Sequence, residues 1–231
     1  MRFTGFLAAF LLAGACASAG TRSGAYKGAI ATDAETGAVL FEDNADAVSP
    51  PASMTKLMTY AVLDDLIKKG SISLDTQVAV TLEDAKVALI KDSTEVWLRQ
   101  GESFSVEEMI YAMMIQSAND AAYAVAHQSA GTVAAFVALM NVKARELGML
   151  SSTFRSPNGF PPRSRRFSEG DLTTPRDFAV LCRYLVLHTD ILKYTSVKSR
   201  VFGAGVRKEP TLMDNHNHLL GKIAGVDGLK T

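Results

Sequence analysis

A serine and a lysine lie three positions apart, as Ser53 and Lys56, in the stretch PASMTKLMTY that begins at Pro51. A proline just ahead of the serine predicts the start of a helix, and residues three apart share one helical face. The helix predicted over about residues 54–69 is apolar almost all round, which is typical of a buried central helix. Burial lowers the pKa of a lysine, so a fraction of Lys56 can be neutral at neutral pH and accept a proton. The pair therefore predicts a serine nucleophile whose general base is a lysine.

Ser-x-x-Lys is a common pattern, and its ordinary interpretation is an N-cap followed by a solvated lysine. Two further elements favour the chemical interpretation. Ser117 and Asn119 lie in IQSANDAAY, at the boundary of two predicted helices, where they could also serve only as caps. Lys230 and Thr231 end the sequence in VDGLKT.

The composition limits the classes of protein to be considered. The chain has 231 residues, of which 48% are hydrophobic, so it can bury a sizeable core. Its 24 basic residues are balanced by 24 acidic ones, which argues against a nucleic-acid-binding protein. We therefore expect no nucleic-acid partner.

The first residues have the layout of a secretory signal. An early Arg2 is followed by an apolar run from Phe6 to Ala15 and by a small-residue site ending at Ala19. We expect residues 1–19 to be a signal peptide and 20–231 to be one exported domain in the periplasm or extracytoplasmic envelope. Lipid attachment at Cys16 is a weaker alternative. No mature stretch has the length of a membrane span, so we expect no membrane anchor in this chain.

The predicted elements place strands near both ends and helices between them, which favours an α/β or α+β fold over a helical bundle. Cys182 is expected on a buried helical face, without an intrachain disulfide partner once the signal is removed. The expected elements are a hairpin around residues 35–37, a strand at 76–81, a capping box of Ser105 and Glu108, helices on either side of Gly131, a loop over 151–173, a helix from Pro175 to Leu187 capped by Thr174, and strands in SRVFGAG and IAGVDGLKT.

The three motifs together resemble those of the penicillin-recognising serine enzymes, which carry Ser-x-x-Lys, Ser-x-Asn and Lys-Thr-Gly. The sequence is most similar to the low-molecular-mass penicillin-binding proteins, the D-alanyl-D-alanine carboxypeptidases, from about Gly28 to Thr231. The resemblance implies a beta-lactamase/transpeptidase-like fold, with an antiparallel sheet flanked by a helical subdomain. Because the family motif continues with glycine after Thr231, we expect that C-terminal strands are missing and that this polypeptide is weakly active or unstable.

The resemblance also implies roles for the motif residues. Ser53 would be the nucleophile, Lys56 its general base, and Ser117 the relay that protonates the departing D-alanine. Asn119 would hold Lys56 and the substrate amide. Lys230 would keep the pocket positive, and Thr231 would bind the terminal carboxylate.

The implied substrate is a peptidoglycan stem peptide ending in D-Ala-D-Ala, with a role in cell-wall biosynthesis and cell shape. Beta-lactams would acylate Ser53, and neither a metal nor a cofactor is expected because covalent catalysis divides the reaction into two easier steps.

Two alternative functions remain open, and one of them is a class A-like beta-lactamase. EGDLT, residues 169–173, is similar to the water-activating Glu-x-x-Leu-Asn loop of class A beta-lactamases. Threonine replaces the asparagine there, so Glu169 is expected to be a surface acid. The other alternative is a non-catalytic peptidoglycan-binding relative.

Two polar features are given structural interpretations. His216 and His218 could bind zinc, but without an obvious third ligand they are expected in a hydrogen-bonding turn. The arginines of the 151–173 loop are expected to be solvated, although they could attract the carboxylates of a stem peptide. They are Arg155, Arg163, Arg165 and Arg166.

Overall fold

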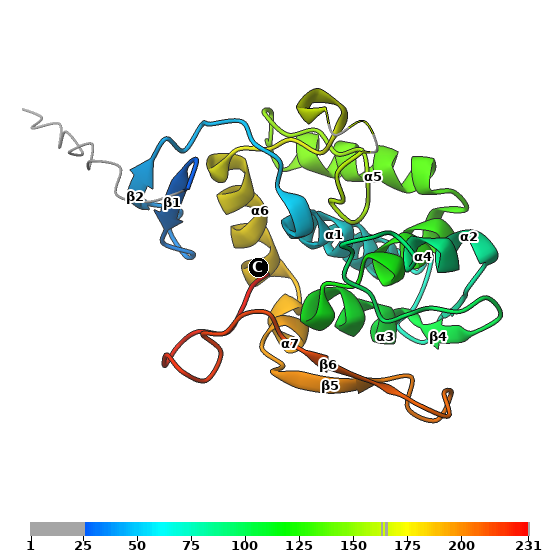
Figure 1. Cartoon of the computed structure of the whole chain (residues 1–231). Coiled ribbons are helices and arrows are strands. Elements are labelled where there is room, and N and C mark those ends of the chain that lie inside the picture. Colours follow the sequence, from blue (N-terminus) through cyan, green and yellow to red (C-terminus); the bar gives the residue numbers. More distant parts are fainter. Residues whose placement is uncertain (1–25, 163, 165, 231) are drawn as a thin grey trace, which may run out of the picture.

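The computed structural model describes residues 26–162, 164 and 166–230, and Figure 1 shows a helical body bordered by small β-hairpins. The predicted signal segment and Thr231 lie outside the described residues. The elements are β1 (Ala29–Thr32), β2 (Val39–Asp43), the 3₁₀ turn η1 (Ala52–Met54), α1 (Thr55–Lys68), β3 (Gln77–Ala79), α2 (Leu82–Val87), β4 (Ser103–Ser105), α3 (Val106–Tyr111), the π-helical turn η2 (Ala112–Gln116), α4 (Asn119–Ala130), α5 (Val133–Glu146), the 3₁₀ turn η3 (Phe167–Glu169), α6 (Pro175–His188), α7 (Ile191–Thr195), β5 (Ser199–Phe202) and β6 (Thr211–Asp214).

The mixed fold expected from the sequence is confirmed. Its described strands form separate antiparallel pairs, β1 with β2, β3 with β4, and β5 with β6. In the first pair, Ala29 lies opposite Asp43, and the Asp33 carboxylate caps the turn by accepting a 2.7 Å hydrogen bond from the Thr36 amide. The predicted N-terminal hairpin is therefore correct, and its turn is fixed by local hydrogen bonds.

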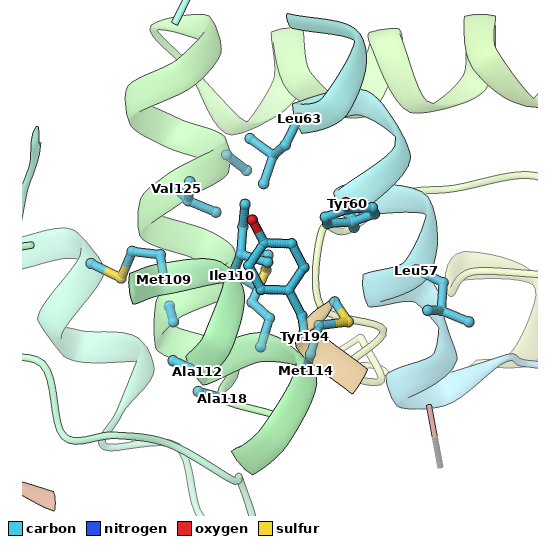
Figure 2. Close-up of a cluster of buried hydrophobic side chains, with 14 of the residues drawn as sticks. Leu57, Tyr60, Leu63, Met109, Ile110, Ala112, Met114, Ala118, Val125 and Tyr194 are labelled. Carbon is cyan, nitrogen blue, oxygen red and sulfur yellow. The ribbon is translucent and has the colours of Figure 1, made fainter. Parts of the chain in front are cut away.

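Helix α1 runs through the centre of the core. Every residue from Thr55 to Leu63 is buried, and Figure 2 shows Tyr60 and Leu63 facing side chains from α3, η2 and α4, with Leu57 on another side of the helix. Tyr194 of α7 closes this cluster, with its ring centroid 5.6 Å from that of Tyr60. The nearly all-apolar sequence of this helix is thus explained by neighbours on several sides.

Several helices begin or end at residues that favour those positions. Gly131, at φ +76°, ends α4, a conformation that favours glycine. Thr174 caps α6 through the Asp177 amide, and Pro175 is the first residue of that helix. On the same helix, Cys182 is half-buried, and burial raises the pKa of its thiol to about 11.

The capping box predicted at α3 is only half formed. Ser105 accepts a hydrogen bond from the Glu108 amide. The Glu108 carboxylate instead accepts a 2.6 Å hydrogen bond from the amide of Gly203, beyond β5. A long-range contact has replaced the local one.

The strand predicted in IAGVDGLKT is wrong for the part that the structure describes. Residues 223–230 form turns and irregular backbone, with positive φ at Gly225 and Gly228. A strand needs a neighbouring strand for its backbone groups. This segment is instead fastened by side chains, because Thr195 donates to the Asp227 carbonyl at 3.3 Å.

No single helix among the described residues has both the length and the apolar composition needed to cross a membrane. Helices α4 and α5 meet that test only when taken together, and they are bent by 90° at their junction.

Candidate active site

Ser53 lies in the 3₁₀ turn immediately before α1, and its side chain is half-buried. The 155–159 loop packs tightly against this turn. A Cβ atom on Gly159 would lie 1.8 Å from the Ala52 carbonyl oxygen, and Gly159 has φ +75°. Glycine is required at that position for both reasons. The turn that carries the serine is therefore supported by a loop about a hundred residues further along the chain.

Lys56 is fully buried, with 0% of its surface exposed. Its Nζ atom lies 3.4 Å from Ser53 Oγ, 2.7 Å from Asn119 Oδ1 and 2.8 Å from the Asn158 carbonyl oxygen. Burial lowers the pKa of Lys56 well below its usual value, and the positive charge of Lys230 lowers it further. The negative charges of Asp120 and Asp171 act in the opposite direction.

Ser117 ends the π-helical turn η2 in a left-handed conformation, with φ +62°. Such a backbone is uncommon for a residue other than glycine and is concentrated at functional sites. The Ser117 hydroxyl is buried and has no hydrogen-bond partner among the described residues. A buried hydroxyl without a partner is available to a bound molecule.

Asn119 joins the lysine to the segment before β4. Its Oδ1 accepts from Lys56, its Nδ2 donates to Ser93 Oγ at 3.0 Å, and its backbone amide donates to the Thr94 carbonyl at 2.7 Å. Asn119 is the first residue of α4 and is buried. Its side-chain oxygen therefore contacts Lys56 and does not cap the helix.

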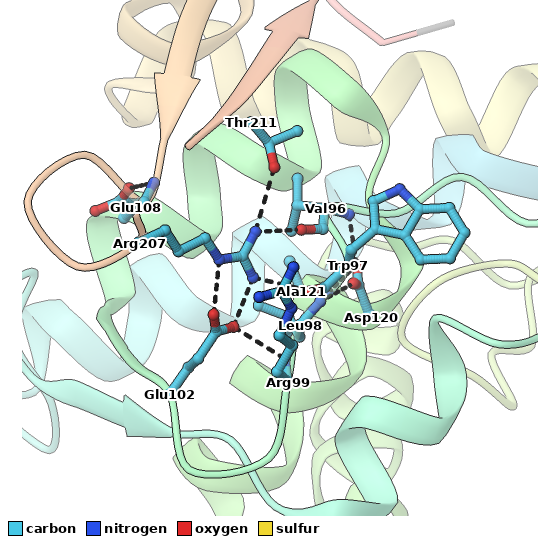
Figure 3. A network of polar contacts seen from close by, with 11 residues as sticks. Val96, Trp97, Leu98, Arg99, Glu102, Glu108, Asp120, Ala121, Arg207 and Thr211 are labelled. Atoms are coloured by element: carbon cyan, nitrogen blue, oxygen red, sulfur yellow. Dashed lines mark hydrogen bonds and ion pairs between the residues drawn. The ribbon is translucent and has the colours of Figure 1, made fainter. Parts of the chain in front are cut away.

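Asp120 and Arg207 hold the same segment from two sides (Figure 3). The Asp120 carboxylate accepts hydrogen bonds from the amides of Val96 and Leu98, at 3.2 and 3.0 Å. The Arg207 guanidinium donates to the Val96 and Trp97 carbonyls and pairs with Glu102 at 2.6 Å. Ser93 and Thr94, which contact Asn119, thus lie next to residues 96–98, which Asp120 and Arg207 hold in place.

Lys230 lies close enough for its charge to act on Lys56, and burial lowers its own pKa to about 8. Asn217 Nδ2 donates to the Gly228 carbonyl at 3.3 Å, which holds the segment leading to Lys230. The structure thus brings Ser53, Lys56, Asn119 and Lys230 into one neighbourhood.

Sequence reasoning missed Asn158 and Asp171, which lie in the loop predicted over 151–173. Asn158 contributes its backbone carbonyl to Lys56, and no side-chain pattern can reveal such a contact. Asp171 accepts a 3.0 Å hydrogen bond from Thr55, the residue next to Lys56. In the sequence, Asp171 was only one residue of the EGDLT stretch, and no role was predicted for it.

The structure places several of the residues that were given structural interpretations, whereas Arg163 and Arg165 lie outside the described residues. Glu169 is an exposed acid that pairs with Arg166 at 3.2 Å. His216 and His218 are exposed, and no set of three possible metal ligands occurs in the part of the chain that the structure describes. Burial, followed by the charge of Lys230, lowers the pKa of His216.

Comparison with known proteins identifies the family of this chain. The sequence matches the peptidase S11 family, D-alanyl-D-alanine carboxypeptidase, over residues 17–231. The chain belongs to this family.

Individual relatives agree with the assignment. The chain is 32% identical to the D-alanyl-D-alanine carboxypeptidase DacF of Bacillus subtilis over 205 residues, 89% of this chain and 50% of the relative. It thus spans about half the length of the curated relatives it matches.

Solved structures share the fold. The carboxypeptidase DacD of Francisella tularensis matches with a TM-score of 0.81 and 25% identity, over 92% of this chain and 60% of the other. Penicillin-binding protein D2 of Listeria monocytogenes, solved in a cefotaxime-bound form, matches with a TM-score of 0.73 and 30% identity, over 89% of this chain and 78% of the other.

Proposed function

We propose that this chain carries the acylation centre of a serine-type D-Ala-D-Ala carboxypeptidase that acts on peptidoglycan stem peptides. The observation that carries the proposal is the arrangement of acceptors around Lys56 Nζ. A neutral amine has two N–H groups and one lone pair. Asn119 Oδ1 and the Asn158 carbonyl can accept only hydrogen bonds, so they take the two N–H groups. The lone pair is then left for the Ser53 hydroxyl, 3.4 Å away.

The first step follows from this arrangement. Lys56 takes the hydroxyl proton while Ser53 Oγ attacks the carbonyl carbon between the two D-alanines. The tetrahedral adduct then collapses, the C–N bond breaks, and the departing D-alanine nitrogen receives a proton through Ser117. Water hydrolyses the resulting ester and restores Ser53.

Lys230 supports the step electrostatically. Its charge disfavours a proton on Lys56 in the resting site and attracts the terminal carboxylate of the substrate. Thr231 would hydrogen-bond the same carboxylate, and Asn119 would contact the substrate amide. Beta-lactams would acylate Ser53 in the same way, as is consistent with the cefotaxime-bound relative.

The peptidoglycan substrate of such an enzyme lies outside the cytoplasm, so the proposal includes export of this chain. The signal-like residues 1–19 support export to the periplasm or extracytoplasmic envelope. A fusion of residues 1–25 to a reporter that is active only after export tests this proposal. A reporter retained in the cytoplasm would contradict it.

The function is tested with a fluorescent penicillin and with a peptide ending in D-Ala-D-Ala. We expect wild-type protein to form a covalent adduct and to release D-alanine, and Ser53→Ala to do neither. Peptide binding by wild-type protein without an adduct would support the non-catalytic alternative. Rapid and sustained hydrolysis of nitrocefin would instead favour a beta-lactamase.

A further inference from the structure

A buried carboxylate contacts the residue that precedes the general base. Asp171 is 6% exposed. Its Oδ2 accepts from Thr55 Oγ1 at 3.0 Å and from Ser156 Oγ at 2.9 Å. Its Oδ1 accepts from the Ser156 amide at 2.9 Å and from the Arg155 amide. The carboxylate therefore connects the first residue of α1 to the start of the 155–159 loop.

This loop is the one that delivers a carbonyl to Lys56. Beyond Ser156, the Pro157 carbonyl accepts a 2.6 Å hydrogen bond from Thr59, and the Asn158 carbonyl accepts from Lys56 at 2.8 Å. The Gly159 amide donates back to Ser156 Oγ at 2.9 Å. Since Asp171 holds the loop at Ser156, it fixes where the Asn158 carbonyl lies relative to the amine.

The charge of Asp171 also reaches Lys56. Four other charged or titratable groups surround the base. Lys230 disfavours a proton on Lys56, as does His216 when it is protonated, whereas Asp120 and Asp171 favour one. Ser53, Asn119 and the Asn158 carbonyl are neutral. Asp171 is thus one of two carboxylates that limit how far burial can displace the proton of Lys56.

We propose that Asp171 is a positioning residue for the general base, which orients the lone pair of Lys56 through the 155–159 loop and places a negative charge near its amine. The inference rests on the proposed function of Lys56. Asp171 touches no reacting atom in this mechanism. It acts through Thr55, Ser156 and the field at Nζ.

The matched variant is Asp171→Asn, which keeps the size of the side chain and the oxygen that accepts from the Arg155 and Ser156 amides. The hydroxyls of Thr55 and Ser156 can rotate to accept from the new amide group, because a hydroxyl is both donor and acceptor. The negative charge is the main loss. We expect the pKa of Lys56 to fall and the acid limb of the acylation–pH profile to move to lower pH.

Two readouts separate this inference from the proposed function. One is the rate of Ser53 labelling by fluorescent penicillin as a function of pH. The other is an NMR titration of the Lys56 amine in ¹⁵N-labelled protein, assigned by the loss of its signal in Lys56→Arg, and it needs no activity. Wild-type protein that shows no adduct would remove the proposed function, whereas a Lys56 titration that is unchanged in Asp171→Asn would overturn the role of Asp171.

Asp84→Asn is the control. Asp84 is also a buried carboxylate, but it caps α2 by accepting from Thr81, and its charge is not among those that act on Lys56. The Asp84→Asn variant should have a lower unfolding temperature, but an unchanged acylation–pH profile and an unchanged NMR titration of Lys56. If it moved the Lys56 titration as far as Asp171→Asn does, the effect would be general and the inference would be wrong.

Asp171→Ala tests the positioning part. It leaves the Arg155 and Ser156 amides without their buried acceptor, so the loop can shift. We expect acylation on the plateau of the pH profile to fall on the order of a hundredfold, as for a small misplacement of a reacting group. Labelling within twofold of wild type in a folded Asp171→Ala protein would contradict it.

Discussion

Two buried lysines, Lys56 of α1 and Lys143 of α5, have pKa values that move in opposite directions. Lys56 donates to two neutral carbonyl oxygens, those of the Asn119 side chain and the Asn158 backbone, and burial lowers its pKa. Lys143 of α5, also buried, contacts the Asp65 carboxylate at 2.9 Å and the Tyr184 hydroxyl at 2.9 Å. Burial opposes its charge too, but the hydrogen bonds of Tyr184 and Asp65 outweigh burial and raise its pKa.

The comparison shows that burial alone does not make a lysine into a base. An adjacent anion keeps the Lys143 ammonium protonated, so it acts as a structural cation. Neutral acceptors satisfy the hydrogen bonds of Lys56 without compensating its charge. The arrangement around Lys143 stabilises the fold, whereas the arrangement around Lys56 leaves a lone pair that can accept a proton.

The largest expected effect comes from removing Lys56, the proposed general base. Lys56→Met should reduce acylation of Ser53 by on the order of a thousandfold, because general-base catalysis typically contributes 10²–10⁴. The rate of penicillin labelling measures this, with Lys143→Met as the matched control. Labelling of Lys56→Met within tenfold of wild type would show that another group accepts the proton.

Asn119→Asp should make Lys56 resemble Lys143. A carboxylate at the position of Oδ1 would favour the charged amine, so its pKa should rise and acylation at neutral pH should fall on the order of tenfold or more. Activity should recover at higher pH, where the amine loses its proton. A rate reduced equally at every pH would mean that Asn119 acts only through contacts with the substrate.

Lys143→Met should change stability and leave acylation nearly unaltered. Loss of the ammonium removes its hydrogen bonds to Asp65 and Tyr184, which keep only a 3.4 Å hydrogen bond to each other, and this should cost about 1–3 kcal/mol in the free energy of unfolding. Denaturant titration measures the loss. A variant as stable as wild type would show that the ion pair contributes only what an apolar side chain can replace.

The smallest expected effect is a difference in how stability depends on pH. Between the lowered pKa of folded Lys56 and about 10.4, the unfolded chain holds a proton that the folded chain lacks, so Lys56 makes stability rise with pH. The contribution of Lys143 has the opposite sign. It is complete below about 10.4 and is lost as pH rises through the raised folded value.

Between about pH 7 and pH 10, the thermal unfolding temperature should therefore rise less steeply with pH in Lys56→Met than in wild-type protein. Lys230, with a pKa lowered to about 8, contributes to the rise in both proteins, so the difference between them isolates Lys56. Parallel curves would mean that Lys56 titrates at its ordinary value in the folded chain.

Local features of the fold were predictable from the sequence because neighbouring residues determine them. The N-terminal hairpin depends on a turn closed by Asp33 and Thr36, and α6 starts where Thr174 and Pro175 require it. The final predicted strand failed because it depended on a distant partner. The segment before Lys230 is held by Thr195 and Asn217.

The sequence by itself determined that Ser53 and Lys56 lie one turn apart on an apolar helix, since that follows from a spacing of three residues. Only the tertiary structure decided what surrounds the amine. The Asn158 carbonyl contacts it from a loop about a hundred residues further along the chain, and the charge of Asp171 acts on it without direct contact. The pKa of a lysine is set by the charges and acceptors that share its desolvated surroundings, and the packing of distant segments chooses them.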